Sequence, residues 1–154
     1  MLKKSFDLTL VTISAPFWFI LIIIIAITSL IFNGRPIFFT QFRGGYKNKK
    51  FKIIKFRTIN SNNKINVYSN FLRFFKFDEL PQIFNILAND MNLIGPRPCL
   101  PKQLELINFR REKGIYQISP GITGYAQVNQ IDMSSPKILA EWDNRYLKMR
   151  SIIL

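Results

Sequence analysis

The segment at residues 8–34 contains no charged residue, and its centre is a continuous apolar run at residues 17–25. As a single helix it would be about 40 Å long, which exceeds the roughly 30 Å of a bilayer's hydrocarbon core. A cleaved signal peptide is disfavoured because the run is too long and no small-residue cleavage site follows it. A buried helix is disfavoured because so small a soluble domain could not cover an apolar helix on every face. The segment therefore predicts a helix embedded in a membrane.

Pro16 divides this apolar helix, because a proline in a helix interior removes one backbone hydrogen bond and bends the axis. Two arrangements follow: a kinked helix that crosses the membrane, or a re-entrant helix that enters and leaves by the same leaflet. Lys3 and Lys4 precede the segment, and a group of bases that begins with Arg35 and Arg43 follows it. Positive residues favour the cytoplasmic face, where a re-entrant helix would keep both groups. The residues by themselves leave both arrangements open.

The composition of the chain is strongly basic. Its 154 residues include 22 Lys and Arg against 9 acidic residues, which gives a formal net charge of +13. This charge favours a polyanionic partner: nucleic acid, an anionic membrane surface or a phosphorylated substrate. The absence of His excludes an imidazole base and most zinc sites. Cys99, the single cysteine, cannot form an internal disulfide and is expected to be a structural residue in a reducing compartment.

The pattern of apolar and turn residues predicts an α/β fold of mixed, helix-rich type. A membrane helix over residues 1–34 is expected to precede a single domain over residues 35–154. Within that domain, residues 37–41 and 51–56 read as two short strands that pair as a hairpin, with a turn at the glycines 44–45.

The remainder of the domain is expected to be mainly helical. Residues 60–70 are polar and rich in Asn, and they predict a loop. Apolar residues at helical spacing over 71–87 predict two helices that meet near residue 77, with Asp78 as the N-cap of the second and Pro81 in its first turn. The further expected elements are a Pro-rich loop at 92–101, an amphipathic helix at 102–113, a turn at 119–124 and a helix at 139–148.

Asp78 and Glu79 are the only adjacent acidic pair in the sequence. An acidic pair at a helix start usually complements the helix dipole and nothing more. A short distance along the chain, however, Arg97 stands between two prolines in a rigid loop, and such a pre-set guanidinium is suited to grip a phosphate. A carboxylate beside a phosphate site can bind Mg²⁺ or attack phosphorus as a nucleophile. Asp90 is a further carboxylate nearby in sequence.

These residues also resemble the motifs of a known family, the bacterial sugar transferases of the small monotopic phosphoglycosyl transferase type. No single motif is specific, but several occur in the expected order, and together they cover nearly the whole chain. The resembling segments are residues 3–7, 36–41, 55–58, 78–82 with Asn85, 90–98, 120–128, and Asp143 with Tyr146.

The resemblance implies a two-step transfer of sugar phosphate from a UDP-sugar to a polyprenyl phosphate such as undecaprenyl phosphate. It makes Asp78 the nucleophile that displaces UMP and forms a phosphosugar-aspartyl intermediate. It makes Glu79 a metal or proton-handling partner, so that Mg²⁺ would be held by Asp78 and Glu79. Arg97 would hold phosphate, and the further expected phosphate contacts are Lys55, Arg57 and Arg73.

The resemblance also implies a location and partners. The N-terminal helix would be re-entrant, with interfacial amphipathic helices and the catalytic domain on the cytoplasmic face of the bacterial inner membrane. The expected partners are the UDP-sugar, the polyprenyl phosphate, membrane lipid and a second copy of the chain in a homodimer, and not nucleic acid. Relatives continue through further amphipathic helices, so the C-terminus at Leu154 is expected to be short or truncated.

Two other functions remain open from the residues. A non-enzymatic, membrane-anchored basic protein could use the bases and aromatic residues between Phe38 and Phe75 to bind anionic lipid or single-stranded nucleic acid. Such a protein would have no use for Asp78 and Glu79 or for an arginine between prolines. A degenerate transferase kept as a scaffold is the second alternative, favoured by the short C-terminus.

Overall fold

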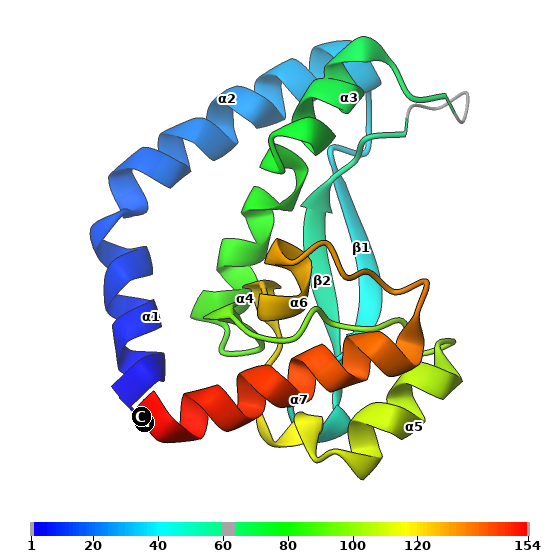
Figure 1. Cartoon of the computed structure of the whole chain (residues 1–154). Coiled ribbons are helices and arrows are strands. Elements are labelled where there is room, and N and C mark those ends of the chain that lie inside the picture. The colour runs from blue at the N-terminus through cyan, green and yellow to red at the C-terminus, as the bar shows by residue number, and fades with distance from the viewer. Residues whose placement is uncertain (1, 60–63, 154) are drawn as a thin grey trace.

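The computed structural model describes residues 2–59 and 64–153. Its N-terminal part is a bent arm of two helices, α1 (Leu2–Ile13) and α2 (Ala15–Asn33), which runs along one side and over the top of the remaining chain (Figure 1). The arm bends at Ser14, one residue before the helix that carries Pro16 in its first turn. The predicted break in the apolar segment is thus confirmed, and α2 ends at Asn33, followed by Gly34 as its C-cap with a positive φ of 70°.

Side-chain donors add to the backbone hydrogen bonds at this bend. Pro16 has no N–H to donate, but the Leu10 carbonyl keeps its usual backbone donor, Ser14 N, at 3.0 Å. Ser14 Oγ donates to the Leu10 carbonyl at 2.8 Å, and the Trp18 indole Nε1 donates to the Val11 carbonyl at 2.9 Å. A carbonyl left unpaired in a lipid environment would cost several kcal/mol, so these donors make a bend tolerable there.

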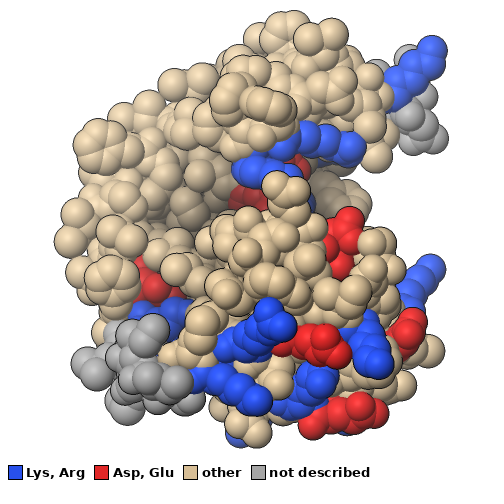
Figure 2. Space-filling model, in the orientation of Figure 1, with Lys and Arg blue, Asp and Glu red and all other residues tan. Residues whose placement is uncertain are grey.

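The outer face of the arm is apolar and uncovered. Phe17 is 80% exposed and Ile31 is 71% exposed, and only 17% of the apolar window of α2 is buried against the rest of the molecule. Figure 2 shows no Lys, Arg, Asp or Glu on the visible face of α2. Within the described residues α2 is the one helix long and apolar enough to cross a membrane. A re-entrant path for it stays a prediction.

The predicted hairpin is present, and it is longer than expected. Strands β1 (Phe38–Gly44) and β2 (Lys50–Phe56) pair antiparallel, with Phe38 opposite Phe56 and Gly44 opposite Lys50. The expected turn at residues 44–45 was misplaced, because Gly44 still belongs to the ladder. The chain reverses through a short 3₁₀ turn, η1 (Tyr46–Asn48), in which Lys47 has a positive φ of 52°.

A helix follows the hairpin earlier than predicted. Helix α3 (Val67–Phe74) begins inside the expected loop because the Asn66 side chain caps it, accepting from Ser69 N at 2.7 Å. The second expected helix is a 3₁₀ segment, η2 (Phe77–Gln82), continued by α4 (Ile83–Leu87). Asp78 is not its N-cap: Lys76 holds that position in the left-handed region at φ 59°, and Asp78 lies in the first turn. Part of the predicted loop, residues 60–63, lies outside the described residues.

Two segments expected to be irregular pair with each other instead. Strands β3 (Asn92–Ile94) and β4 (Gly121–Thr123) form a two-stranded parallel ladder. Glycines make this possible, because a Cβ on Gly121 would lie 2.1 Å from the backbone nitrogen of Gly95. The predicted loop at 92–101 and turn at 119–124 were therefore wrong in part, since neither sequence shows how closely two backbones approach.

The rest of the chain is mainly helical, and its helices pack on one another. Helix α5 (Leu104–Glu112), the 3₁₀ turn η3 (Ile115–Gln117), the short α6 (Tyr125–Val128) and the long α7 (Pro136–Ile153) follow in order. Cys99 is fully buried between α5, α6 and α7, as expected of a structural cysteine. The end of α7 lies beside the start of α1 (Figure 1), where Lys3 Nζ donates to the Tyr146 hydroxyl at 2.5 Å.

Candidate active site

A cavity of about 560 Å³ opens between the β1–β2 hairpin, η2 and the loop that carries Arg97. We call it the Asp78 cavity. It brings together all six residues that the sequence nominated, from segments far apart in the chain. Its walls are formed by Phe39, Arg43, Lys55, Phe56, Arg57, Thr58, Ile59, Arg73, Lys76, Asp78, Glu79 and Arg97. Asp90, the other nearby carboxylate, is not among them.

Glu79 is the electrostatic centre of the cavity wall. Its side chain is only 8% exposed, and Oε1 accepts from Lys55 Nζ at 2.6 Å and from Arg97 Nη2 at 2.7 Å. Burial raises the pKa of Glu79, but the two cations outweigh it and lower the pKa to about 2. Glu79 is therefore a permanent anion that orients Lys55 and Arg97.

Asp78 differs from its neighbour in its partners and in the direction of its pKa shift. It is partly buried in the cavity wall, and no hydrogen bond or ion pair to another described residue holds its carboxylate. Burial raises the pKa of Asp78, Lys55 opposes that shift, and the Glu79 charge adds to it. A carboxylate that is desolvated and not engaged in an ion pair retains its lone pairs for a ligand.

Other arginines that line the cavity are held by hydrogen bonds or by burial of their guanidinium groups. Arg57 donates from Nη2 to the Asn33 carbonyl at 2.6 Å, which ties the site to the end of α2. Arg73 donates from Nε to Thr58 Oγ1 at 2.8 Å. The Nε atoms of Arg43 and Arg57 are buried and have no partner among the described residues. Guanidinium donors fixed in this way are arranged to receive an anion.

The sequence did not nominate Arg43, Lys76 or Thr58 as site residues. Lys76 precedes the acidic pair and was visible as one of several nearby bases. Its left-handed backbone conformation, which turns the chain between α3 and η2, gave no signal in the sequence. Arg43 was visible only as one of a run of bases, because nothing in that run shows which side chains of a strand point into a cavity.

The carboxylates present fit Mg²⁺ only in a limited way. No group of three or more His, Cys, Asp or Glu side chains suited to a metal exists in the described part of the chain. One Glu79 oxygen is already taken by Lys55 and Arg97, so Asp78 is the protein ligand that the geometry offers. Mg²⁺ commonly binds through one carboxylate together with substrate phosphates and water, and the cavity suits that arrangement better than the expected Asp78–Glu79 pair.

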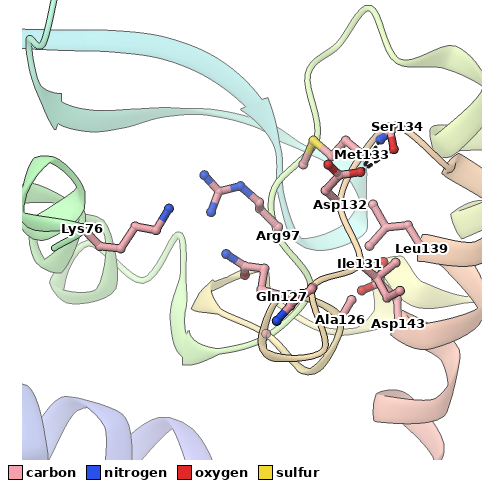
Figure 3. A pocket seen from close by; sticks show the side chains of 12 residues that line it. Lys76, Arg97, Ala126, Gln127, Ile131, Asp132, Met133, Ser134, Leu139 and Asp143 are labelled. Carbon is pink, nitrogen blue, oxygen red and sulfur yellow. Dashed lines mark hydrogen bonds between the residues drawn. The ribbon is translucent and has the colours of Figure 1, made fainter. Parts of the chain in front are cut away.

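A second cavity, of about 460 Å³, lies on the other side of Arg97. We call it the Gln127 cavity. Lys76 and Arg97 line both cavities and form the border between them. Figure 3 shows Lys76 and Arg97 extending toward each other, with the Gln127 amide beside Arg97. The remaining walls of the Gln127 cavity come from α6, the segment before α7 and the first turns of α7: Gly124, Ala126, Gln130, Ile131, Asp132, Met133, Ser134, Leu139 and Asp143.

A buried ion pair holds the Arg97 loop from behind. Arg110 on α5 donates from Nε and Nη2 to Asp143 Oδ2 on α7, at 2.9 and 2.7 Å, and each side chain is 3% exposed. The remaining arm of the guanidinium donates from Nη1 to the Arg97 carbonyl at 2.9 Å. Burial raises the pKa of Asp143, and Arg110 opposes that shift. Two helices thus fix the backbone of the residue whose side chain separates the cavities.

Comparison with known proteins shows which family the chain belongs to. The family model described as bacterial sugar transferase matches residues 1–154. The chain is 34% identical to the uncharacterized sugar transferase EpsL of Bacillus subtilis, over 83% of this chain and 68% of that protein. It is 31% identical to the UDP-N-acetylgalactosamine-undecaprenyl-phosphate N-acetylgalactosaminephosphotransferase of Aeromonas hydrophila, over 99% of this chain and 40% of that protein.

A third relative is the UDP-glucose:undecaprenyl-phosphate glucose-1-phosphate transferase of Escherichia coli, 30% identical over 84% of this chain and 31% of that protein. The chain therefore spans less than half the length of the two relatives with a named substrate. The site sets an acidic pair among basic residues, and the described part of the chain includes one apolar helix long enough to cross a membrane. The chain belongs to the bacterial sugar transferase family of enzymes, which confirms the resemblance found in its motifs.

Proposed function

We propose that the protein transfers a sugar 1-phosphate from a UDP-sugar to a polyprenyl phosphate, with release of UMP. The observation that carries this function is the state of Asp78. Its carboxylate has no ion-pair partner among the described residues, and it shares the Asp78 cavity with a surplus of bases whose positions are fixed. Named relatives use UDP-sugars and undecaprenyl phosphate, as their descriptions state, which supports the same substrates here.

In the first step an Asp78 carboxylate oxygen attacks the sugar-bearing phosphorus of the UDP-sugar. A bond forms from that oxygen to phosphorus, the bond between this phosphorus and the bridging oxygen breaks, and UMP departs with the electron pair. Phosphoryl transfer depends mainly on positioning and on neutralising charge. Lys55 and Arg97, held by Glu79, and the fixed guanidiniums of Arg57 and Arg73 supply that neutralisation.

In the second step an oxygen of the polyprenyl phosphate attacks the phosphosugar-aspartyl intermediate. The new bond joins two phosphates, the Asp78 oxygen leaves as a free carboxylate, and a polyprenyl diphosphate sugar results. Mg²⁺, if held by Asp78 and the substrate phosphates, would offset the charge of the diphosphate. The pKa of Glu79 is too low for it to exchange protons near neutral pH, so we assign it a positioning role in place of the expected proton handling.

The apolar arm supports a membrane location for this reaction. A polyprenyl phosphate keeps its chain in the bilayer and its phosphate at the interface, so the acceptor site must lie at that interface. Phe39 on β1 is exposed and lines the cavity, and Phe71 and Phe74 on α3 are exposed as well. We propose that the arm enters and leaves by the cytoplasmic leaflet and that these residues rest in the interface.

Release of UMP tests the function directly. The whole chain, in lipid discs with undecaprenyl phosphate and Mg²⁺, would be given a panel of UDP-sugars while free UMP is followed. We expect release with at least one sugar, and mass spectrometry of the quenched protein should find a phosphosugar on Asp78 when the acceptor is omitted. Folded protein that releases UMP from none of them would contradict the proposal and favour a scaffold.

A further inference from the structure

We propose that the Gln127 cavity receives the nucleoside of the departing nucleotide, and that Gln127 and Asp132 bind it. This assignment rests on the proposed function and extends it to a second compartment of the same site. The two cavities share only Lys76 and Arg97, so a ligand whose phosphates contact those two cations can place one end in each.

The direction of the displacement decides which end goes where. In phosphoryl transfer the attacking and leaving oxygens lie roughly in line on opposite sides of phosphorus. Asp78 lines the Asp78 cavity and not the Gln127 cavity. An attack by its carboxylate therefore drives the leaving group away from the Asp78 cavity. Arg97 lies at the border between the two cavities, and the Gln127 cavity lies on the other side of this border from Asp78. The sugar must stay with Asp78 for the second step, whereas the nucleotide must leave by a separate route.

The Gln127 cavity holds one carboxylate without an ion-pair partner, Asp132, and its charge is otherwise confined to the border or already paired. Its cations, Lys76 and Arg97, stand at the border, and Asp143 in its wall is already paired with Arg110. The remaining walls combine apolar surface from Ile131, Met133 and Leu139 with a few polar groups, as is usual where a flat heterocycle binds.

Gln127 supplies a polar atom without a partner at this cavity. Its amide lies beside Arg97 (Figure 3), and its Oε1 is buried with no hydrogen-bond partner among the described residues. Buried polar atoms are nearly always hydrogen-bonded, so an orphan that faces a cavity calls for an explanation. A carboxamide can donate to and accept from the imide edge or the hydroxyls of a uridine.

Asp132 is placed to accept from ribose hydroxyls. Its Oδ1 accepts from Ser134 N and Ser134 Oγ, at 2.9 and 2.6 Å, which orients the carboxylate and lowers its pKa. Oδ2 makes no hydrogen bond in that turn, and Asp132 is an exposed residue that lines the cavity. A carboxylate that hydrogen-bonds ribose hydroxyls is a recurrent device of nucleotide sites.

Binding of UMP without turnover tests the assignment. Calorimetric titration of the whole chain in lipid discs would compare UMP, 2′-deoxy-UMP and glucose 1-phosphate. We expect Gln127→Leu to weaken UMP binding about fivefold to tenfold, the cost of one lost hydrogen bond. The matched control is Gln117→Leu, an exposed glutamine that does not line the cavity, and it should leave UMP affinity unchanged.

Asp132 gives a second test that does not depend on a buried residue. The wild-type chain should bind UMP more tightly than 2′-deoxy-UMP, and Asp132→Asn should reduce that preference. If both variants bind UMP as the wild type does but alter the preference among UDP-sugars, the cavity holds the sugar and the assignment is wrong. If UMP binding depends on Gln127 but no sugar phosphate is transferred, the proposed function is wrong and the nucleoside site stands. If transfer and UMP binding are the same in both variants as in the wild type, the nucleoside site is wrong and the proposed function stands.

Discussion

Two acid–base clusters hold Arg97, one from each side, and they are built differently. The cavity cluster of Glu79, Lys55 and Arg97 sets one carboxylate against two cations, and the Arg97 side chain stays 32% exposed. The buried pair of Arg110 and Asp143 matches one charge with one charge, each side chain 3% exposed, and reaches Arg97 only through its backbone carbonyl. The cavity cluster holds the Arg97 guanidinium, and the buried pair holds the Arg97 backbone.

The difference shows which cluster is free to bind. The cavity cluster keeps a net positive charge after all its internal contacts are made, so it can still accept an anion. The buried pair has no charge to spare, and the desolvation of its members is offset only by each other. We infer that the first serves substrate binding and that the second fixes the position of the loop.

The largest expected effect falls on the carboxylate that belongs to neither cluster. Asp78→Asn removes the proposed nucleophile, and UMP release should fall at least about 10³-fold. Burial raises the pKa of Asp78, so its charge weakens the fold at neutral pH, and the variant should unfold at the same temperature as the wild type or higher. In the wild type, activity should fall as the pH drops through this raised pKa. An active Asp78→Asn enzyme would exclude the aspartyl intermediate.

Breaking the buried pair should give the largest loss of stability. Burial raises the pKa of Asp143 as it does that of Asp78, but Asp143→Asn also leaves the buried Arg110 charge unpaired. That cost outweighs the gain from removing the carboxylate charge, so the free energy of unfolding should fall by about 3–5 kcal/mol. Denaturant titration followed by intrinsic fluorescence would measure it. The double variant Arg110→Met with Asp143→Leu should regain much of that stability, yet it loses the hydrogen bond to the Arg97 carbonyl. If its turnover matches the wild type, the pair does not position the loop.

The cavity cluster should show a smaller stability effect with a distinct pH dependence. The pKa of Glu79 is lowered to about 2 in the folded chain from an ordinary value of 4.5. Its ion pairs therefore stabilise the fold fully above pH 4.5, and this contribution, roughly 2–3 kcal/mol, is lost as the pH falls toward 2. Glu79→Gln should be less stable at pH 6, lack that acid dependence, and turn over about tenfold more slowly because Lys55 and Arg97 lose their orientation.

A loss of stability that is the same at every pH would contradict this role for the Glu79 charge. If Glu79→Gln and the wild type differ in stability by the same amount at pH 6 and at pH 3, the cations do not depend on the Glu79 charge. Glu79→Asp is the matched control, since it keeps the charge and shortens the reach. It should retain the acid dependence while it loses turnover.

Much of this site could be predicted from the sequence, because its members belong to short motifs. Asp78, Glu79 and Arg97 stood out as a charged pair and as an arginine between prolines, and Lys55, Arg57 and Arg73 came with the family resemblance. All six line one cavity. The apolar arm and its break were equally visible, since uncharged length and a proline act locally on a helix.

What could not be predicted depends on contacts between distant segments. The pairing of β3 with β4 requires Gly95 and Gly121 to approach within a distance that excludes any side chain, and neither segment has a strand-like pattern. The capping of α3 by Asn66 was hidden in a run of asparagines. The hydrogen bond from Arg110 to the Arg97 carbonyl joins residues on two elements whose contact has no local signature.

The smallest expected effect on stability comes from a variant in the arm, which serves as a control for the variants in the two clusters. Trp18→Phe keeps the edge-on packing against Phe84, with ring centroids 5.6 Å apart in the wild type, but loses the indole donor to the Val11 carbonyl. Ser14 Oγ still lies 3.2 Å from that carbonyl, so the free energy of unfolding should fall by only about 0.5–1 kcal/mol.

Turnover of this variant decides how the others are interpreted. The bend lies outside both clusters, so its loss of stability should leave UMP release close to wild type. If Trp18→Phe instead slows turnover as much as Glu79→Gln does, then activity follows the seating of the arm in the bilayer, and the slow turnover of the cluster variants could not be assigned to Arg97. A normal rate would leave displacement of Lys55 and Arg97 as the cause.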